Sequence, residues 1–392
     1  MIDFEFISPT KIYFGHQKEQ KVGVAAKEFG FRKTLIVYGS RHALSSGLID
    51  LAREKLGDEG IETFLLSGVR ANPTITKVKE GLAIARKEGI DSILCIGGGS
   101  VIDTGKSIAA NFFYEGDPFD FNLKKAAVSK ALPIGVILTI ASAGSEMSNS
   151  CVIQDDERMI KQGFNSDLVR PAFAIMNPEL TFSVPTYMAA AGVSDIIMHS
   201  LERYLILGDG NELCDDWALD LIAKTMQYGP KSLQNPTDYE AKSAIMLQGA
   251  LSHNGLTHLG KEFGFTVHPV EHALSGYKPD IIHGAGVALL YPAIAQIGLR
   301  REPKKYAELT RRLFKIGLEN EKETAIIGAA KMKEFFSSIG MPSSFADVAP
   351  AFMVCFALVF FFDSFFIAFS SMSAKVICLA LSGNVWRRLR KI

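Results

Sequence analysis

Residues 92–112 read SILCIGGGSVIDTGKSIAANF, and this segment indicates how the first half of the chain folds. Its apolar start has the character of a buried strand, and the segment after Ser100 has the apolar spacing of a helix. Glycines 97–99 join the two, and glycine lets a backbone approach a ligand closely. A helix that begins at such a turn offers free N–H groups and the positive end of its dipole to an anion. The stretch therefore predicts a phosphate site, with a plain turn capped by Ser100 as the alternative.

Two better-known phosphate motifs fail in this stretch. A P-loop has a glycine five residues before the glycine of its GKS end. Five residues before Gly105 this chain has Ser100. The GxGxxG fingerprint also fails, because Ile102 occupies the position of its third glycine. The glycine-rich turn therefore follows neither motif.

The alternation of strand and helix signals continues through the first 185 residues. Short β-branched runs are separated by helical stretches rich in Lys and Glu, which is typical of a parallel sheet covered by helices. From about residue 187 helical periodicity replaces the strand signals, and no internal repeat is apparent. We therefore expect an α/β domain at residues 1–185 and an all-α domain at residues 186–392. The clearest predicted strands are 34–39, 62–68, 92–98 and 134–140.

Length and composition limit the range of functions. A chain of 392 residues is long enough for two domains, each with its own core. The 42 basic and 42 acidic side chains balance, so the charge gives no reason to expect nucleic acid or an acidic membrane surface as a partner. The five cysteines include no CxxC pair, which indicates a reducing compartment. Residues 1–15 do not resemble a signal peptide, so we expect a cytoplasmic protein.

One aspartate and several histidines have the spacing of metal ligands. Six of the eight histidines fall between positions 199 and 283. Asp195 and His199 are four residues apart, which places both side chains on one face of a helix. His268 and His272 repeat that offset, and His283 heads an HGAG turn. One carboxylate with three imidazoles suits Fe²⁺ or Zn²⁺. Although each histidine alone would be interpreted as a surface or core residue, the set predicts a metal site made by two helices and a loop.

The end of the first predicted strand bears on the choice of nucleotide. NAD-binding sites usually place an acidic residue there for the ribose 2′-hydroxyl, whereas a 2′-phosphate needs small or cationic neighbours. Here the strand ends in Tyr38-Gly39-Ser40-Arg41, without a carboxylate. This favours NADP. If Gly39 and Ser40 only end a strand, the choice stays open.

Several motifs, in their order along the chain, resemble those of the iron-containing (group III) alcohol dehydrogenases. The resemblance covers about residues 4–345 and implies a dinucleotide-binding α/β domain, a helical domain and an active site in the cleft between them. It also implies a dehydroquinate synthase-like architecture and a homodimer. The motifs are GGGSVID (97–103), NPT (72–74), ASAGSEMS (141–148), NPELTFSVP (177–185), GVSDIIMHSLE (192–202), HNGLTHLG (253–260) and HPVEHALSGYKPDIIHGAG (268–286).

The resemblance implies roles for individual residues. The family's metal ligands match Asp195, His199, His268 and His283, and His272 matches a histidine near the nicotinamide that is proposed to relay protons. Gly39 and Ser40 match the subgroup that accepts NADP. The positions that match cofactor contacts are Gly39, Ser40, Asn72, Gly98, Gly99, Ser100, Asp103, Thr139 and Lys161.

Some positions depart from the family's pattern. The spacing from His268 to His283 is fifteen residues, where many members have fourteen, so the loop before the last ligand is one residue longer. Asn177 replaces an aspartate, which we expect to affect a turn and not the chemistry. His253 and His258 match no ligand position, and we expect them to shape the substrate pocket or to be polar helix residues.

The tail departs most from the family. Residues 349–369 carry one charged side chain, Asp363, and are long enough to span a bilayer. Three interpretations explain this sequence: a membrane anchor flanked by the basic end at 387–391, a buried apolar helix, and a C-terminus replaced through a shifted reading frame. We expect no membrane span, because every matched metal and cofactor residue lies at or before position 283 and a charge at the bilayer centre is unfavourable.

The implied reaction interconverts a small primary alcohol and its aldehyde by hydride transfer with NADP(H) or NAD(H). Few arginines and lysines stand near the ligand motifs, so a phosphorylated or carboxylated substrate is not indicated. This shortage also weighs against a non-redox lyase of the dehydroquinate synthase type. A catalytically inactive metal-binding relative is the other alternative.

Overall fold

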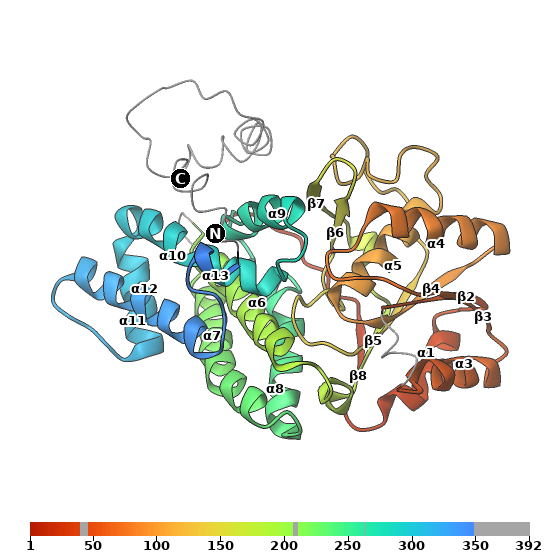
Figure 1. Cartoon of the computed structure of the whole chain (residues 1–392), viewed down its shortest axis with the longest axis horizontal. Helices are drawn as coiled ribbons and strands as arrows, with labels where there is room; N and C mark the ends of the chain where they lie inside the picture. Colours follow the sequence, from red (N-terminus) through yellow and green to blue (C-terminus); the bar gives the residue numbers. More distant parts are fainter. Residues whose placement is uncertain (40–45, 207–210, 263, 349–392) are drawn as a thin grey trace.

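A parallel sheet forms the centre of the N-terminal part of the molecule (Figure 1). The computed structural model describes residues 1–39, 46–206, 211–262 and 264–348. Within these residues the sheet has six strands in the order β1-β8-β5-β4-β2-β3, all parallel to their neighbours. The predicted parallel α/β fold is thereby confirmed. The strands are β1 (Lys11–Phe14), β2 (Lys33–Tyr38), β3 (Glu62–Leu66), β4 (Ser92–Gly97), β5 (Ile134–Leu138) and β8 (Phe173–Met176).

Helices cover both faces of this sheet, which explains why its strands are apolar without alternation. On β2, Leu35 and Val37 enter the core beneath α4 and α5, whereas Ile36 and Tyr38 enter the core beneath α1 and α3. Figure 1 shows the two helix pairs on opposite sides of the sheet. The helices are α1 (Val22–Glu28), α3 (Leu48–Asp58), α4 (Ile75–Glu88) and α5 (Gly99–Asn111).

A separate antiparallel hairpin, which the sequence did not indicate, lies between the sheet and the helical part. Its strands are β6 (Ser150–Asp155) and β7 (Ile160–Asn165). The backbone N–H of Gln154 donates to Pro73 O at 2.8 Å, and its side-chain amide donates to Gly276 O at 3.2 Å. The hairpin therefore contacts both parts of the molecule.

The chain beyond residue 185 is helical in its described residues, as the sequence predicted. Helix α6 begins at Thr186, directly after Pro185, and every residue from 190 to 204 is buried. It packs against α7, α8 and α10, so it lies at the centre of the helical core. The helices are α6 (Thr186–Tyr204), α7 (Glu212–Gln234), α8 (Tyr239–Ser252), α9 (Val267–Tyr277), α10 (His283–Arg301), α11 (Pro303–Phe314), α12 (Glu321–Ser338) and α13 (Phe345–Val348).

Short 3₁₀ turns connect some of these elements. Asn177 caps one of them, because its side chain accepts a hydrogen bond from the N–H of Glu179 at 3.1 Å. This agrees with the expectation that Asn177 shapes a turn. The turns are η1 (Lys18–Lys21), η2 (Asp167–Val169), η3 (Pro178–Thr181) and η4 (Leu256–His258).

The structure bears in part on what the sequence predicted for the apolar C-terminal tail and for the cysteines. The apolar tail, with Cys355 and Cys378, lies outside the described residues. In the part of the chain that is described, no helix has both the length and the apolar character that crossing a bilayer requires. Cys95, Cys151 and Cys214 are buried free thiols.

The close approach of α10 to α6 depends on Gly284. A Cβ atom at this position would lie 1.9 Å from Ala191 O. We predict that Gly284→Ala lowers the free energy of unfolding of the metal-free protein by about 1–3 kcal/mol, because a backbone must move to admit the methyl group. Urea unfolding measures the loss. Gly57→Ala, on helix α3 with no atom within 4 Å of the added Cβ, is the control and should leave stability equal or slightly higher. Equal midpoints for Gly284→Ala and the wild type would contradict this packing.

Candidate metal and cofactor site

A cleft of about 1200 Å³ lies between the carboxyl ends of the sheet strands and helices α6, α9 and α10. In open α/β folds this edge of the sheet is where ligands bind. Ser40 lies outside the described residues. The other candidate residues from the sequence all line the cleft: Gly39, Asn72, Gly98, Gly99, Ser100, Asp103, Thr139, Lys161, Asp195, His199, His268, His272 and His283.

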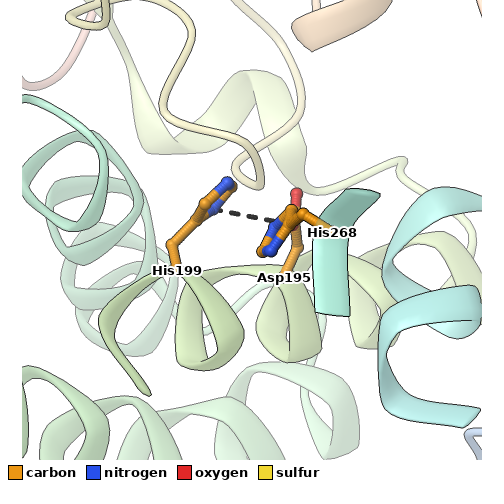
Figure 2. Close-up of side chains that lie close together, drawn as sticks. All are labelled: Asp195, His199 and His268. Atoms are coloured by element: carbon orange, nitrogen blue, oxygen red, sulfur yellow. Dashed lines mark ion pairs between the residues drawn. The ribbon is translucent and has the colours of Figure 1, made fainter. Parts of the chain in front are cut away.

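Asp195 lies at the centre of the candidate metal ligands. It precedes His199 by one turn of α6, and His199 Nδ1 lies 3.5 Å from Asp195 Oδ1. His268 of α9 brings its Nε2 to 3.5 Å from the same oxygen, and His283 brings its Nε2 to 3.6 Å. Figure 2 shows Asp195, His199 and His268 side by side, with the two ligands of α6 on one face of the helix. The structure therefore brings together all four residues that the sequence selected.

The facing atoms of three of these side chains have no hydrogen-bond partner among the described residues. They are Asp195 Oδ1, His199 Nδ1 and His268 Nε2, and all are buried. Each buried polar atom without a hydrogen-bond partner lowers the stability of the folded protein by about 1–3 kcal/mol. The ligand atoms of these three residues lie within 4.8 Å of one another, and a carboxylate with imidazoles is a donor set for a divalent transition metal ion. The residues therefore fit a bound cation.

The placement of His283 differs from the prediction. From the sequence we expected His283 at the head of a turn, but it is the first residue of α10. The site thus joins three helices and not two helices and a loop. Its side chain is 24% exposed, whereas those of Asp195 and His199 are 1% and 5% exposed. His283 is consequently the candidate ligand on the open side of the cluster.

Two buried carboxylates behind the ligands were missed by the sequence analysis. His268 Nδ1 contacts Glu202 Oε2, and His283 Nδ1 contacts Glu271 Oε2. A carboxylate on the far nitrogen fixes the orientation of a ligating imidazole and increases its basicity. The sequence carried a signal for Glu202, because it stands three residues after His199 and seven after Asp195 on one helix face. Glu271 likewise stands three residues after His268.

Protonation differs among the ligands. Burial and the nearby histidines and Arg203 lower the pKa of His199 well below its usual value, so this imidazole is neutral. Burial would also lower the pKa of His268, but the charges of Glu202 and Asp195 outweigh it and raise the pKa to about 9. In the metal-free protein His268 therefore carries a proton that a metal ion must displace.

The glycine-rich turn has the predicted form. Strand β4 ends at Gly97, Gly98 is the N-cap, and α5 begins at Gly99. A Cβ on Gly98 would lie 3.0 Å from Ile140 Cβ, because the loop after β5 packs against the turn. Thr139 belongs to this loop and donates its N–H to Gly97 O at 3.1 Å. The start of α5 therefore faces the cleft as an anion site would.

Asp103 has protein partners of its own. Its carboxylate accepts hydrogen bonds from Ser145 Oγ at 2.6 Å and from the N–H of Val152 at 3.0 Å. Burial raises its pKa. Asp103 thus ties α5 to the hairpin at the edge of the cleft.

His272 lies one turn after His268 on α9, and its ring centroid is 5.4 Å from that of His283. Burial, with the positive charge of Lys161, lowers the pKa of His272 well below its usual value. His272 is therefore a neutral imidazole beside the candidate metal site, and it can accept a proton only transiently.

Arg203 is a basic side chain next to the candidate ligands. It is buried, and its guanidinium donates to His199 O at 2.8 Å. It also contacts His253 Nδ1 at 3.0 Å and donates to His258 Nδ1 at 3.3 Å. Both of these histidines line the cleft, as expected. The group Arg203, His253 and His258 forms a polar wall next to His199.

Comparison with known proteins identifies the class. The model of the iron-containing alcohol dehydrogenases matches residues 9–178, and that of the C-terminal region of the Fe-containing alcohol dehydrogenase family matches residues 188–349. The chain therefore belongs to the iron-containing alcohol dehydrogenase family.

Individual relatives agree with this assignment. NADH-dependent butanol dehydrogenase A of Clostridium acetobutylicum is 37% identical over 352 residues, which cover 89% of this chain and 90% of the relative. The NADPH-dependent aldehyde reductase of Escherichia coli is 27% identical over 88% of this chain and 89% of its own length. The crystal structure of NADH-dependent butanol dehydrogenase A from Thermotoga maritima superposes with a TM-score of 0.86 at 34% identity, over 89% of this chain and 87% of that one.

The proton on His268 leads to a pH prediction. Because His268 is protonated below a pH of about 9 in the metal-free protein, the affinity for Zn²⁺ should increase with pH. The gain should approach about tenfold per pH unit below the pKa and level off above it, since one proton is displaced for each ion bound. Titration calorimetry in two buffers of different ionisation enthalpy measures the proton released. Binding without proton release at pH 7 would contradict the assignment of His268 as a ligand.

Proposed function

We propose that this chain interconverts a small primary alcohol and its aldehyde by hydride transfer with a nicotinamide dinucleotide. The observation that carries the proposal is the trio of unpartnered buried atoms on Asp195, His199 and His268, located in the same cleft as the glycine-rich turn. In this proposal Asp195, His199, His268 and His283 hold one divalent ion. The family's description favours Fe²⁺, with Zn²⁺ as the alternative. The comparisons give no support for the lyase alternative.

When bound, the ion and the nicotinamide would supply the redox chemistry, namely polarisation of the substrate oxygen and exchange of hydride with the carbon. The chain's own residues bind and orient. The start of α5, with Gly98, Gly99 and Ser100, would hold the pyrophosphate, and Gly39, Ser40 and Thr139 would line the nucleotide's path. Asp103 would support this wall of the cleft through Ser145.

His272 would take part in proton transfer. Its neutral ring lies beside His283, in the cleft that substrate and nicotinamide would share. A neutral imidazole can accept the alcohol's proton and pass it to solvent. In the opposite direction it would return a proton to the product oxygen. The low pKa makes the protonated form short-lived, which suits a relay more than a permanent proton store.

The relatives' names bear on substrate and cofactor. They include butanol dehydrogenases, an aldehyde reductase and 1,3-propanediol dehydrogenases, so we propose a short-chain alcohol or aldehyde as substrate. The two butanol dehydrogenases of Clostridium acetobutylicum are named as NADH-dependent and the aldehyde reductase as NADPH-dependent. These names cover both nucleotides. We propose NADP(H) for this chain, because no carboxylate follows β2 where the ribose 2′-hydroxyl would lie.

We propose that the chain is organised as a nucleotide-binding domain at residues 1–185 and a metal-binding domain at residues 186–392. We also propose that the protein is a cytoplasmic homodimer. Light scattering on the purified protein measures the oligomeric state. A monomer at micromolar concentration would contradict the dimer.

The metal and the activity should depend on the same residues. We predict that the protein loaded with Fe²⁺ or Zn²⁺ oxidises NAD(P)H when butanal is added, and that His199→Ala and His268→Ala lose both bound metal and turnover. Absorbance at the NAD(P)H band and metal analysis by mass spectrometry are the measurements. His16→Ala, with an exposed ring outside the cleft, is the control and should keep both. Unchanged metal content in both cleft variants would contradict the site, and a metal-loaded wild type without turnover on any alcohol or aldehyde would indicate the inactive alternative.

The nucleotide preference can be tested at Gly39. We predict that the wild type has a higher kcat/KM with NADPH than with NADH. Gly39→Asp should lower the NADPH-to-NADH ratio by about tenfold or more, because a carboxylate would repel the 2′-phosphate and bind the 2′-hydroxyl. A Cβ at this position would lie 3.2 Å from Val69 O, so Gly39→Ala is the matched control for crowding and should leave the ratio unchanged. A wild type that uses NADH at least tenfold better would refute the assignment.

A further inference from the structure

Arg203 of α6 holds two histidines next to the candidate metal site. Its Nη2 lies 3.0 Å from Nδ1 of His253, and its Nε donates to Nδ1 of His258 at 3.3 Å. A guanidinium has N–H donors and no acceptor, so each Nδ1 accepts and each neutral ring carries its proton on Nε2. A protonated ring is excluded, because its Nδ1–H would face an N–H of the guanidinium. Arg203 therefore fixes the tautomer of both histidines.

The Nε2–H of His253 is open to the cleft. His253 is partly exposed and lines the cleft, and its contact with Arg203 is its one hydrogen bond to the residues that the structure describes. Nε2 is not among the buried polar atoms without a partner, so this edge of the ring is accessible. A histidine with a purely structural role would have partners at both nitrogens. This donor is therefore available to a bound molecule.

The ring of His253 lies directly beside a candidate metal ligand. Its centroid is 4.2 Å from that of His199 and 6.1 Å from that of Phe265. Of the described residues, two groups of three offer ligand atoms within 4.8 Å of one another, and His253 belongs to neither. Its Nδ1 is also engaged by Arg203. His253 is consequently a neighbour of the metal site and not a ligand.

Packing fixes the position of His253 as well. Gly144, in the loop after β5, has a φ of 64°, and a Cβ there would lie 2.9 Å from Cβ of His253. A glycine is needed for this close approach. The loop after β5 and the rings of His199 and Phe265 thus hold the side chain in place. A donor held in this way is pre-organised to bind a ligand group.

The charges near this donor favour a neutral oxygen over an anionic one. Lys261 forms an ion pair with Asp215, and Arg170 forms one with Asp167 at 2.7 Å. Arg203 is 2% exposed, so its charge does not reach the cleft surface directly. The group that faces the cleft is a neutral N–H. A hydroxyl oxygen matches this donor, whereas a carboxylate would be removed from water without a facing counter-charge, which is unfavourable.

We propose that His253 is a specificity-determining residue whose Nε2–H donates to a second oxygen of the substrate, a hydroxyl on the chain whose first oxygen is at the metal. Arg203 is the positioning residue that keeps the proton of His253 on Nε2. The substrate is then a short diol or the corresponding hydroxyaldehyde. The inference rests on the proposed function and narrows its substrate class, and the hydride transfer is unchanged.

The test compares 1,3-propanediol with 1-butanol as substrates of the metal-loaded enzyme. The two molecules have the same number of non-hydrogen atoms and differ in a hydroxyl or a methyl group at the far end. The diol should have a kcat/KM at least about tenfold higher, because a methyl group leaves the N–H of His253 without an acceptor. The difference should lie mainly in KM, since the far end is bound alike before and during hydride transfer. A preference below about threefold overturns the proposal.

Two variants of His253 assign the preference to its N–H. His253→Phe keeps a ring beside His199 and removes both nitrogens, so the two alcohols should have kcat/KM values within about threefold of each other. His253→Gln places an amide N–H near the position of Nε2 and should recover part of the preference. His16→Phe is the matched control, since His16 stacks on Tyr239 outside the cleft, and its preference should equal that of the wild type. An unchanged preference in His253→Phe, with kcat lowered equally for both alcohols, overturns the proposal.

The tautomer can be measured without turnover. Nitrogen-15 NMR of histidine-labelled, metal-free protein distinguishes a protonated from an unprotonated ring nitrogen, and the signals of His253 are those that disappear in His253→Phe. We expect a protonated Nε2 and an unprotonated Nδ1 at neutral pH in the absence of substrate. A proton on Nδ1 overturns the proposal, because Arg203 then does not fix the ring as inferred.

A third substrate and the wild type alone separate the remaining outcomes. A higher kcat/KM for 4-hydroxybutanoate than for 1,3-propanediol identifies a carboxylate as the preferred group and overturns the assignment to a hydroxyl. Turnover of 1-butanol without a preference for the diol refutes this inference and leaves the proposed function intact. A metal-loaded wild type that oxidises none of the alcohols refutes the proposed function itself.

Discussion

The buried carboxylate of Asp195 is the charge around which helices α6, α9 and α10 converge. His199, His268 and His283 direct ring nitrogens at one of its oxygens from distances of 3.5, 3.5 and 3.6 Å. Without a metal ion, Asp195 Oδ1, His199 Nδ1 and His268 Nε2 are removed from water and form no hydrogen bond, which is unfavourable by several kcal/mol in total. Such a cluster persists because the surrounding helices are packed closely enough to hold it, and a divalent ion would convert the unfavourable contacts into ligand bonds. The tight crossing of α10 over α6 therefore shapes the candidate metal site as well as the hydrophobic core.

The sheet part supports the same cluster from the opposite wall of the cleft. Ser142, in the loop after β5, donates to Asp195 Oδ2 at 2.9 Å, and the same loop packs against the glycine-rich turn. Lys161 of the hairpin donates to Ser275 of α9, and Asn72 in the loop after β3 donates to Pro279 in the segment between α9 and α10. The surfaces proposed to hold the nucleotide and the metal are consequently linked by short polar contacts. Such links would keep the nicotinamide and the substrate oxygen at a fixed separation, which hydride transfer requires.

Much of this arrangement could be predicted from local patterns. The buried strands, the glycine turn, the start of α6 near residue 187 and the four clustered ligand candidates each follow from a periodicity or a spacing in the sequence. We could not predict strands β1 and β8, which have four residues each, or the hairpin, because these segments are too short or too polar to show a clear hydrophobic pattern. Glu202 and Glu271 could have been found from their helical offsets to His199 and His268. Their function, however, depends on the imidazole rings of His268 and His283, behind which they lie. The role of Arg203 and the contacts of Lys161 depend on segments far apart in the chain, and no local pattern encodes them.

Diffraction from crystals grown with iron, recorded at the iron absorption edge, would locate the bound ion. We expect one anomalous peak per chain, about 2.0–2.3 Å from a carboxylate oxygen of Asp195 and from one ring nitrogen each of His199, His268 and His283. We also expect the Glu202 and Glu271 carboxylates to lie behind the rings, outside bonding distance of the metal. A peak bounded by Glu271, His272 and His283, or iron-loaded crystals with no peak at Asp195, would contradict a metal site centred on Asp195.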